Sequence, residues 1–138
     1  MDRILIEDKL ESLHRCVQRI EAKRPENANV LAQDWDRQDI IALNLTRAVQ
    51  LCVDVAAHII ASKGGRPPDT MAEAFDRLAS ESIIPGKLAQ RLKGAVGFRN
   101  IAIHQYQDVN WDIVHSIIHT RLVDFKRFAQ VVLNETDP

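Results

Sequence analysis

The sequence predicts an all-α protein, an up-down helical bundle of about five helices in a single domain spanning residues 1–138. Apolar residues recur at three- and four-residue spacing along most of the chain, which is typical of helices with one buried face. Glycine (5 residues) and aromatic residues (5%) are scarce, whereas β-sandwiches and barrels need many turns and β-rich runs. The length suffices for one hydrophobic core.

The first helix is expected over Arg3–Lys23, with Asp2 as its cap, and a polar stretch at 24–27 ends it. The second is expected over about Asp36–Lys63, with Gly and Pro at 64–68 as its stop signal.

Three further helices follow. A capping box, Thr70–Glu73, starts a helix to about Ser80. Pro85 suits the first turn of a fourth helix that runs to about His104. Asn110 caps a fifth, whose core-facing stripe comprises Ile113, Val114, Ile117, Ile118, Leu122, Phe125 and Phe128.

The second helix is apolar around most of its circumference. Such a helix is buried on both sides, which is hard to arrange inside one small protomer. We therefore expect one side to face a second subunit in a homodimer; the alternative is a fully enclosed central helix. The apolar residues concerned are Ile40, Ile41, Leu43, Leu45, Val49, Leu51, Val53, Val55, Ile59 and Ile60.

Charge and cysteine usage point to a cytoplasmic protein. The charged start of the chain does not resemble a signal peptide, and no apolar run approaches the length of a membrane span, so no membrane partner is expected. Cys16 and Cys52 lie among apolar residues and are expected to be buried thiols. The net charge is −1, yet no acidic residue lies between Glu81 and Asp108, where there are four basic ones: Lys87, Arg91, Lys93 and Arg99. This local positive patch fits either contact with a polyanion or a solvated helix face.

Arg99 falls in the middle of the apolar stripe of the fourth helix, which includes Leu88, Leu92, Ala95, Val96 and Ile103. A charge there is costly unless it is satisfied. Three environments would satisfy the Arg99 guanidinium. Its tip could reach solvent, it could pair with a carboxylate such as Asp54, or it could line a cleft that receives an anion such as phosphate.

His104 lies five residues after Arg99 and points about 140° away in an unbroken helix. One active site needs both side chains. Either the helix ends near Ile103 and frees His104, or a two-fold axis brings the residues of two protomers into one groove. Asn100 is placed to support the imidazole or bind a phosphate oxygen.

The segment Arg99-Asn100-Ile101-Ala102-Ile103-His104-Gln105-Tyr106 resembles the Arg-x4-6-His motif of HEPN domains, and more closely the Arg-x4-His-x-Tyr form of HepT-type toxins. The blocks 44–50 and 54–59 are similar to that family's long second helix, and the resemblance covers essentially the whole chain.

This resemblance implies a metal-independent endoribonuclease that needs no cofactor. Arg99 would bind the scissile phosphate, and His104 would act as general base on the RNA 2′-hydroxyl or as general acid. The substrate would be mRNA or tRNA. The implied partner is an MntA-type nucleotidyltransferase antitoxin that transfers AMP to Tyr106, the only tyrosine, and so blocks RNA by occupancy and charge.

Two pairs of residues that contain histidine have the i, i+4 spacing. Asp54 and His58 on the second helix are candidates to hydrogen-bond each other as supporting residues of the cleft, or to pair across a dimer. His115 and His119 have the spacing of two metal ligands, but no third ligand is evident, so no metal site is expected.

Two alternative functions stay open. One is a non-catalytic HEPN module that presents nucleotide or substrate to a partner nucleotidyltransferase. The other is a purely structural dimerisation domain, for which substitution of Arg99 or His104 would change only stability.

Overall fold

The computed structural model describes residues 1–136 as helices and connecting loops, with no strand in that range. The predicted all-α class is therefore confirmed. The elements are α1 (Arg3–Lys23), α2 (Ala28–Gln33), α3 (Trp35–Ser62), α4 (Met71–Ser80), α5 (Gly86–His104), the 3-10 helix η1 (Tyr106–Asp108), α6 (Trp111–Thr120) and α7 (Leu122–Thr136).

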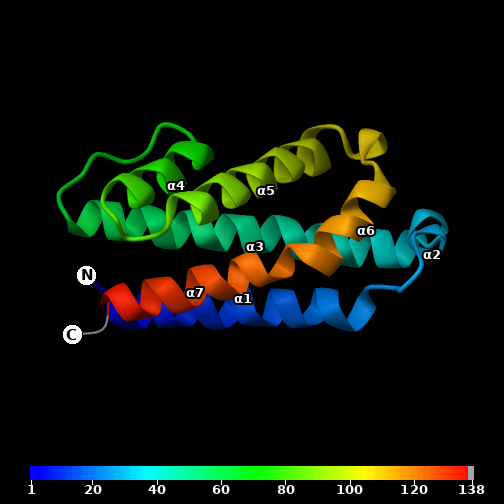
Figure 1. The fold of residues 1–138 in the computed structure, drawn as a ribbon, viewed down its shortest axis with the longest axis horizontal. Helices are drawn as coiled ribbons and strands as arrows, with labels where there is room; N and C mark the ends of the chain where they lie inside the picture. Colours follow the sequence, from blue (N-terminus) through cyan, green and yellow to red (C-terminus); the bar gives the residue numbers. More distant parts are fainter. Residues whose placement is uncertain (137–138) are drawn as a thin grey trace.

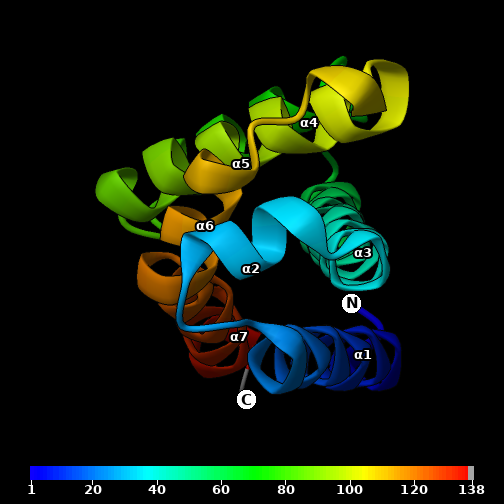
Figure 2. The same ribbon diagram turned by 90° about the vertical axis from the view of Figure 1, so that its right-hand side faces the viewer.

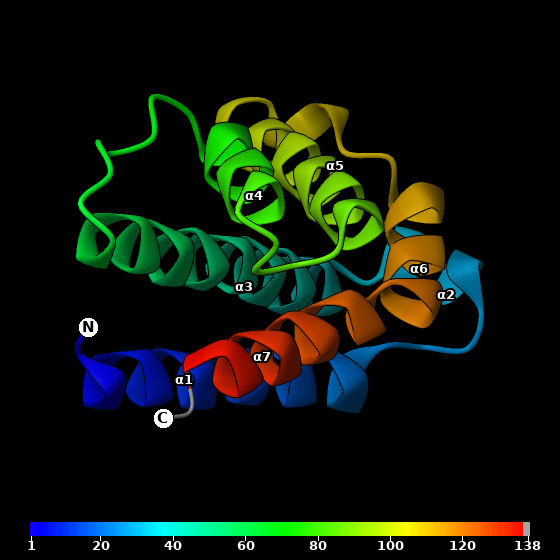
Figure 3. The ribbon, with the colours of Figure 1, turned by 60° about the vertical axis from the view of Figure 1, so that its left-hand side comes forward.

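Four long helices, α1, α3, α5 and α7, run alternately up and down the molecule (Figure 1). The start of α1 and the end of α7 lie at one end of the bundle, and α2 crosses the opposite end (Figures 1 and 2). α4 and α5 form a hairpin that packs over α3 (Figure 3). The end of α5 and the start of α3 therefore lie at the same end of the molecule as α2 and α6.

The predicted helix signals hold at four boundaries. Asp2 accepts a hydrogen bond from the Leu5 amide and caps α1, and Asn110 caps α6 through the amides of Asp112 and Ile113. Thr70 caps α4 by accepting from the Glu73 amide, while Glu73 accepts from the Asp69 amide rather than from Thr70 itself. α3 ends at Ser62, and Gly64 follows two residues later with a φ of 80°, the left-handed conformation that glycine tolerates.

The expectation of about five helices was wrong, because the described residues form seven α-helices. α2 was missed since it has only six residues and one buried side chain, Leu31. The expected fifth helix is two helices, α6 and α7, separated at Arg121. No glycine or proline marks that break, and the apolar periodicity continues across it. Ile113, assigned to the core stripe, is 58% exposed.

α3 is the central helix of the bundle and packs against α1, α2, α4, α5 and α7 within one chain. Thirteen of its residues are buried. The argument that its apolar surface needs a second subunit was therefore wrong, since one protomer buries most of it. Trp35 (79% exposed) and Leu43 (49% exposed) remain uncovered.

By length and composition alone, Trp35–Ser62 also meets the criterion for a membrane span, with a mean hydropathy of 1.5 in its most apolar window. The expectation that no apolar run approaches that length was wrong on this criterion. More than half of that window is buried among the other helices, as in the core helix of a bundle. One hydrophobic cluster joins α3 to the helices around it.

Candidate active site

Arg99, Asn100 and His104 lie on the last turns of α5, and Tyr106 opens η1 directly after it. The helix ends because Gln105 leaves the helical conformation (φ −143°, ψ 52°), although its amide still donates to the Ile101 carbonyl. The turn of η1 is closed by the Asp108 amide, which donates to the Gln105 carbonyl, and by the Val109 amide, which donates to the Tyr106 carbonyl. This sequence of turns fixes Tyr106 close to the end of the helix.

The Arg99 side chain is partly buried, and its Nε is fully buried with no hydrogen-bond partner among residues 1–136. Its Nη1 donates to Asn100 Oδ1 (3.2 Å). A buried donor without an acceptor costs about 1–3 kcal/mol. Of the three environments considered for Arg99, the structure excludes only the carboxylate pair among the described residues, since the exposed Nη1–Asn100 contact is compatible both with a side chain that reaches solvent and with one that binds an anion.

Asp54 does not pair with Arg99, because its carboxylate accepts from Lys9 Nζ (3.4 Å) and from Gln50 Nε2 (2.8 Å). Nor does it bond to His58, whose Nε2 accepts from the Asp2 amide (3.0 Å). Both residues lie toward the other end of α3. The structure therefore does not bring Asp54 or His58 to Arg99 within one protomer.

His104 is exposed and is the last residue of α5. The helix thus ends one residue after Ile103, and Arg99 and His104 both lie within it. Ile103 itself is 49% exposed, so the buried stripe of α5 stops short of it. In the continuous helix, Arg99 and His104 point about 140° apart. Asn100 bonds to Arg99, not to the imidazole.

Tyr106 donates a hydrogen bond from its hydroxyl to Asp39 Oδ1 (2.7 Å), near the start of α3. Its ring lies against Trp111, with the ring centroids 5.8 Å apart, and 37% of the residue is exposed. Partial burial raises the pKa of the hydroxyl above its usual value, and the hydrogen bond and negative charge of Asp39 raise it further. The phenol is therefore neutral, accessible and held by one carboxylate.

Asp39 was not identified from the sequence. It lies 67 residues before Tyr106, and nothing in its local pattern distinguishes it from a solvent-facing acid on an amphipathic helix. Only the packing of the η1 turn beside the start of α3 brings the two side chains together.

Ion pairs reduce the positive patch predicted on α5. Arg91 pairs with the buried carboxylate of Asp124 (3.3 Å), and Lys93 pairs with Asp76 (3.1 Å). Half of the four predicted positive charges are therefore matched by acids from other helices. The patch as a whole does not form a free basic surface.

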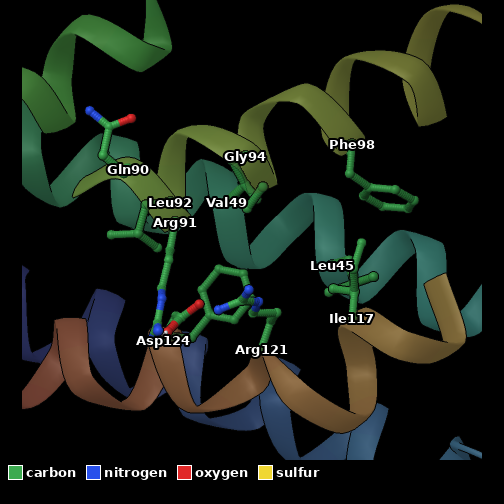
Figure 4. A pocket seen from close by; sticks show the side chains of 12 residues that line it. Leu45, Val49, Gln90, Arg91, Leu92, Gly94, Phe98, Ile117, Arg121 and Asp124 are labelled. Carbon is green, nitrogen blue, oxygen red and sulfur yellow. Dashed lines mark hydrogen bonds and ion pairs between the residues drawn. The ribbon is translucent and has the colours of Figure 1, made fainter. Parts of the chain in front are cut away.

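A largely apolar cavity of about 380 Å³ lies between α5 and the α6–α7 junction, with the Arg91–Asp124 pair and Arg121 at its polar side (Figure 4). Gly94 and Phe98 of α5 line it, but Arg99, His104 and Tyr106 do not. The cavity and the motif are therefore separate features of this end of α5.

His115 and His119 bind the polypeptide backbone instead of forming part of a metal site. Nε2 of each approaches the Pro25 carbonyl oxygen, at 3.0 Å and 2.9 Å, and thereby links α6 to the loop after α1. Among residues 1–136, no group of three or more His, Cys, Asp or Glu side chains has the arrangement of a metal site.

Residues 7–132 match the family described as Ribonuclease HepT-like. The chain belongs to the HepT-like ribonuclease family. The resemblance drawn from residues 99–106 and from the long helix is thereby confirmed.

Characterised proteins extend this match. The chain is 36% identical over 135 residues to the mRNA nuclease HepT of Shewanella oneidensis, covering 98% of this chain and all of that protein. It is 24% identical over 134 residues to the tRNA nuclease HepT of Aphanizomenon flos-aquae, covering 96% of this chain and 90% of that protein.

The fold matches that of a HEPN toxin solved in complex with an antitoxin. The solved structure of the tri-AMPylated Shewanella oneidensis HEPN toxin in complex with an MNT antitoxin superposes with a TM-score of 0.89. That chain is 34% identical to this one, and the match covers 97% of this chain and 99% of the other.

Proposed function

We propose that this HepT-like chain is an endoribonuclease toxin that cleaves RNA without a metal ion, with Arg99 and His104 as catalytic residues. The observation that carries the proposal is the buried Arg99 Nε, which has no acceptor among the described residues, one to two turns before an exposed histidine. A scissile phosphate supplies the missing acceptor.

The proposed reaction uses the RNA 2′-hydroxyl as nucleophile. Its oxygen attacks the adjacent phosphorus, its proton passes to an imidazole, and the bond from phosphorus to the 5′ oxygen breaks as that oxygen takes up a proton. Arg99 stabilises the negative charge that builds on the phosphoryl oxygens. His104 transfers a proton as general base or general acid.

The proposal includes a homodimer that brings the two catalytic residues together. Arg99 and His104 point apart on one helix, so a two-fold axis that pairs the ends of two α5 helices brings Arg99 of one protomer toward His104 of the other. Ile101 (43% exposed) and Ile103 (49% exposed) are apolar side chains of α5 left uncovered at this end of the protomer. Burial of such surface favours association.

Tyr106 is the proposed site at which an MntA-type nucleotidyltransferase antitoxin attaches AMP. It is the only tyrosine of the chain, it is accessible, and it lies two residues after His104. An AMP group there adds a phosphate and a nucleoside beside Arg99 and His104, which excludes RNA by occupancy and charge repulsion.

We place this activity in the cytoplasm, where RNA is available and thiols stay reduced. Cys16 and Cys52 support that placement, because both are buried free thiols. mRNA and tRNA are the candidate substrates, in keeping with the names of the two relatives.

The test is expression of the chain alone in a bacterial host, beside Arg99→Ala and His104→Ala, with total RNA examined. Growth arrest with RNA cleavage that either substitution abolishes supports the ribonuclease. Harmless accumulation of unmodified wild-type protein with intact RNA overturns it and favours the non-catalytic binding module.

A further inference from the structure

A cleft of about 490 Å³ lies between α1 and α3, the two helices that pack most extensively against each other. Three arginines line it: Arg15 and Arg19, one turn apart on α1, and Arg47 on α3. Ser12 and Gln50 add a hydroxyl and an amide. All three arginines are exposed, so their guanidinium groups are available to a ligand.

The positive charge of this cleft is not neutralised. No acidic residue lines it, and none of the three arginines forms an ion pair within the part of the chain that the structure describes. Asp54, the acid bonded to Gln50, is itself paired with Lys9 (3.4 Å). On a chain of net charge −1, three unmatched arginines in one concave site form a distinct anion-attracting surface.

The buried thiol of Cys16, which lines this cleft, lies in the positive potential of the arginines. Burial raises the pKa of Cys16, while the positive charges of Arg47 and Arg15 act in the opposite direction. The positive charges of two arginines from different helices thus act on the same thiol.

We propose that the Arg15–Arg19–Arg47 cleft binds the phosphodiester backbone of the RNA substrate next to the cut site. Planar guanidinium groups make paired hydrogen bonds to phosphate oxygens, and backbone contacts of this kind position a nucleic acid without reading its sequence. This inference rests on the proposed ribonuclease function.

One exposed face of α3 runs from the cleft toward the catalytic end of the molecule. Asp39, Leu43 and Arg47 are exposed and follow one another at intervals of four residues, which places them on one face of the helix. Asp39 holds Tyr106. Arg47 lies eight residues further on, about 12 Å along the axis. A single RNA strand spans this distance with a few nucleotides, so one strand contacts both the arginine cleft and the catalytic end.

The test measures binding of a short RNA whose 2′-hydroxyls are methylated, so that it cannot supply the nucleophile. Wild type is compared with the triple variant Arg15→Gln, Arg19→Gln, Arg47→Gln. The control removes three exposed charges elsewhere (Lys23→Gln, Arg66→Gln, Arg127→Gln). Losing three phosphate contacts lowers the slope of log affinity against log salt by about 2, since each contact to a single strand contributes about 0.7. The control keeps the wild-type slope.

Equal slopes of log affinity against log salt for the cleft variant and its control overturn the proposal that the cleft binds RNA. Loss of antitoxin binding in the cleft variant with an unchanged RNA slope overturns it as well and assigns the arginines to the antitoxin instead. Absence of RNA cleavage by wild type, scored separately on unmethylated RNA, marks failure of the proposed function rather than of the cleft.

An independent observation, the 2.7 Å hydrogen bond from the Tyr106 hydroxyl to Asp39, carries a second inference, which rests on the proposed AMP transfer. The geometry points to Asp39 as the base that receives the proton of Tyr106 during modification. The phenolic oxygen forms a bond to the α-phosphorus of ATP, the bond to pyrophosphate breaks, and the phenolic proton passes to the Asp39 carboxylate.

Intact-mass measurement of AMP uptake, with antitoxin and ATP, tests this role in Asp39→Asn, Asp39→Glu and the control Asp36→Asn. General base catalysis is worth about 100-fold or more, so Asp39→Asn slows uptake by about that factor. Its rate then rises with pH as solution hydroxide supplies the phenolate. Asp39→Glu recovers part of the rate, and Asp36→Asn matches wild type. Equal rates for Asp39→Asn and wild type overturn the inference, whereas no uptake by wild type overturns Tyr106 modification itself.

Discussion

At the scale of single residues, two side chains at the end of α5 are in unusual states. Arg99 has a buried Nε without an acceptor among the described residues, and the Tyr106 hydroxyl donates a hydrogen bond to the Asp39 carboxylate. Both states cost the isolated protein stability or reactivity. An anion that accepts a hydrogen bond from Arg99 accounts for the first state. A nucleotidyltransferase that modifies Tyr106 accounts for the second.

Replacing Arg99 by Met should stabilise the fold while it removes activity. Met keeps most of the apolar length and leaves no buried donor unsatisfied. We expect the free energy of unfolding to rise by about 1 kcal/mol. Urea denaturation of Arg99→Met and wild type measures the difference, with Arg91→Met, which breaks the pair to Asp124, as a destabilised control. A clear loss of stability in Arg99→Met would mean that the guanidinium is satisfied in the native protein.

The titration of Tyr106 is directly observable because the chain has one tyrosine. Asp39→Asn removes the negative charge that opposes the phenolate, so the pKa of Tyr106 should fall toward the ordinary value of about 10. Ultraviolet absorbance of the phenolate, followed against pH, measures it. Superimposable titrations of Asp39→Asn and wild type would show that the two groups are not in contact in solution.

At the scale of elements, the sequence predicted what local chemistry determines. The caps Asp2, Thr70 and Asn110 and the glycine stop after α3 are local features, and they appear where they were expected. The break at Arg121 was not predictable, because no turn residue marks it and its neighbours keep helical periodicity. Asp39 was missed for a related reason, since its partner comes from a distant turn.

The N-terminus of α6 offers a measurable element-scale effect. Asn110 accepts hydrogen bonds from the amides of Asp112 and Ile113 (3.0 and 3.3 Å). Asn110→Ala removes both and should cost about 1 kcal/mol of unfolding free energy. Asn110→Asp keeps an acceptor and serves as the matched control in the same denaturation series. Equal midpoints for the alanine and aspartate variants would show that the cap does not stabilise α6.

At the scale of the whole molecule, the fold places the last turns of α5 at one end and the start of α1 and the end of α7 at the other (Figure 1). The sequence predicted the helix class and the motif, but its argument for a dimer from α3 failed. One protomer already surrounds that helix with five others. The case for a dimer rests instead on the divergent directions of Arg99 and His104.

In the proposed dimer, each active site takes Arg99 from one protomer and His104 from the other, so two inactive variants should restore activity when combined. Arg99→Ala and His104→Ala homodimers should each be inactive, whereas a mixture refolded together should regain part of the wild-type rate through heterodimers with one intact Arg99–His104 pair. Ile101→Glu should shift the protein toward monomer in sedimentation analysis and reduce activity in parallel. A fully active monomer would contradict the two-fold arrangement.

The most direct measurement of the central claim is cleavage of RNA by the purified, unmodified chain in the presence of EDTA. The account predicts that wild type cleaves RNA under these conditions and leaves a 5′-hydroxyl on the released fragment, and that Arg99→Ala and His104→Ala, folded by circular dichroism, do not. Intact RNA with wild-type protein, or undiminished cleavage by either variant, would contradict it.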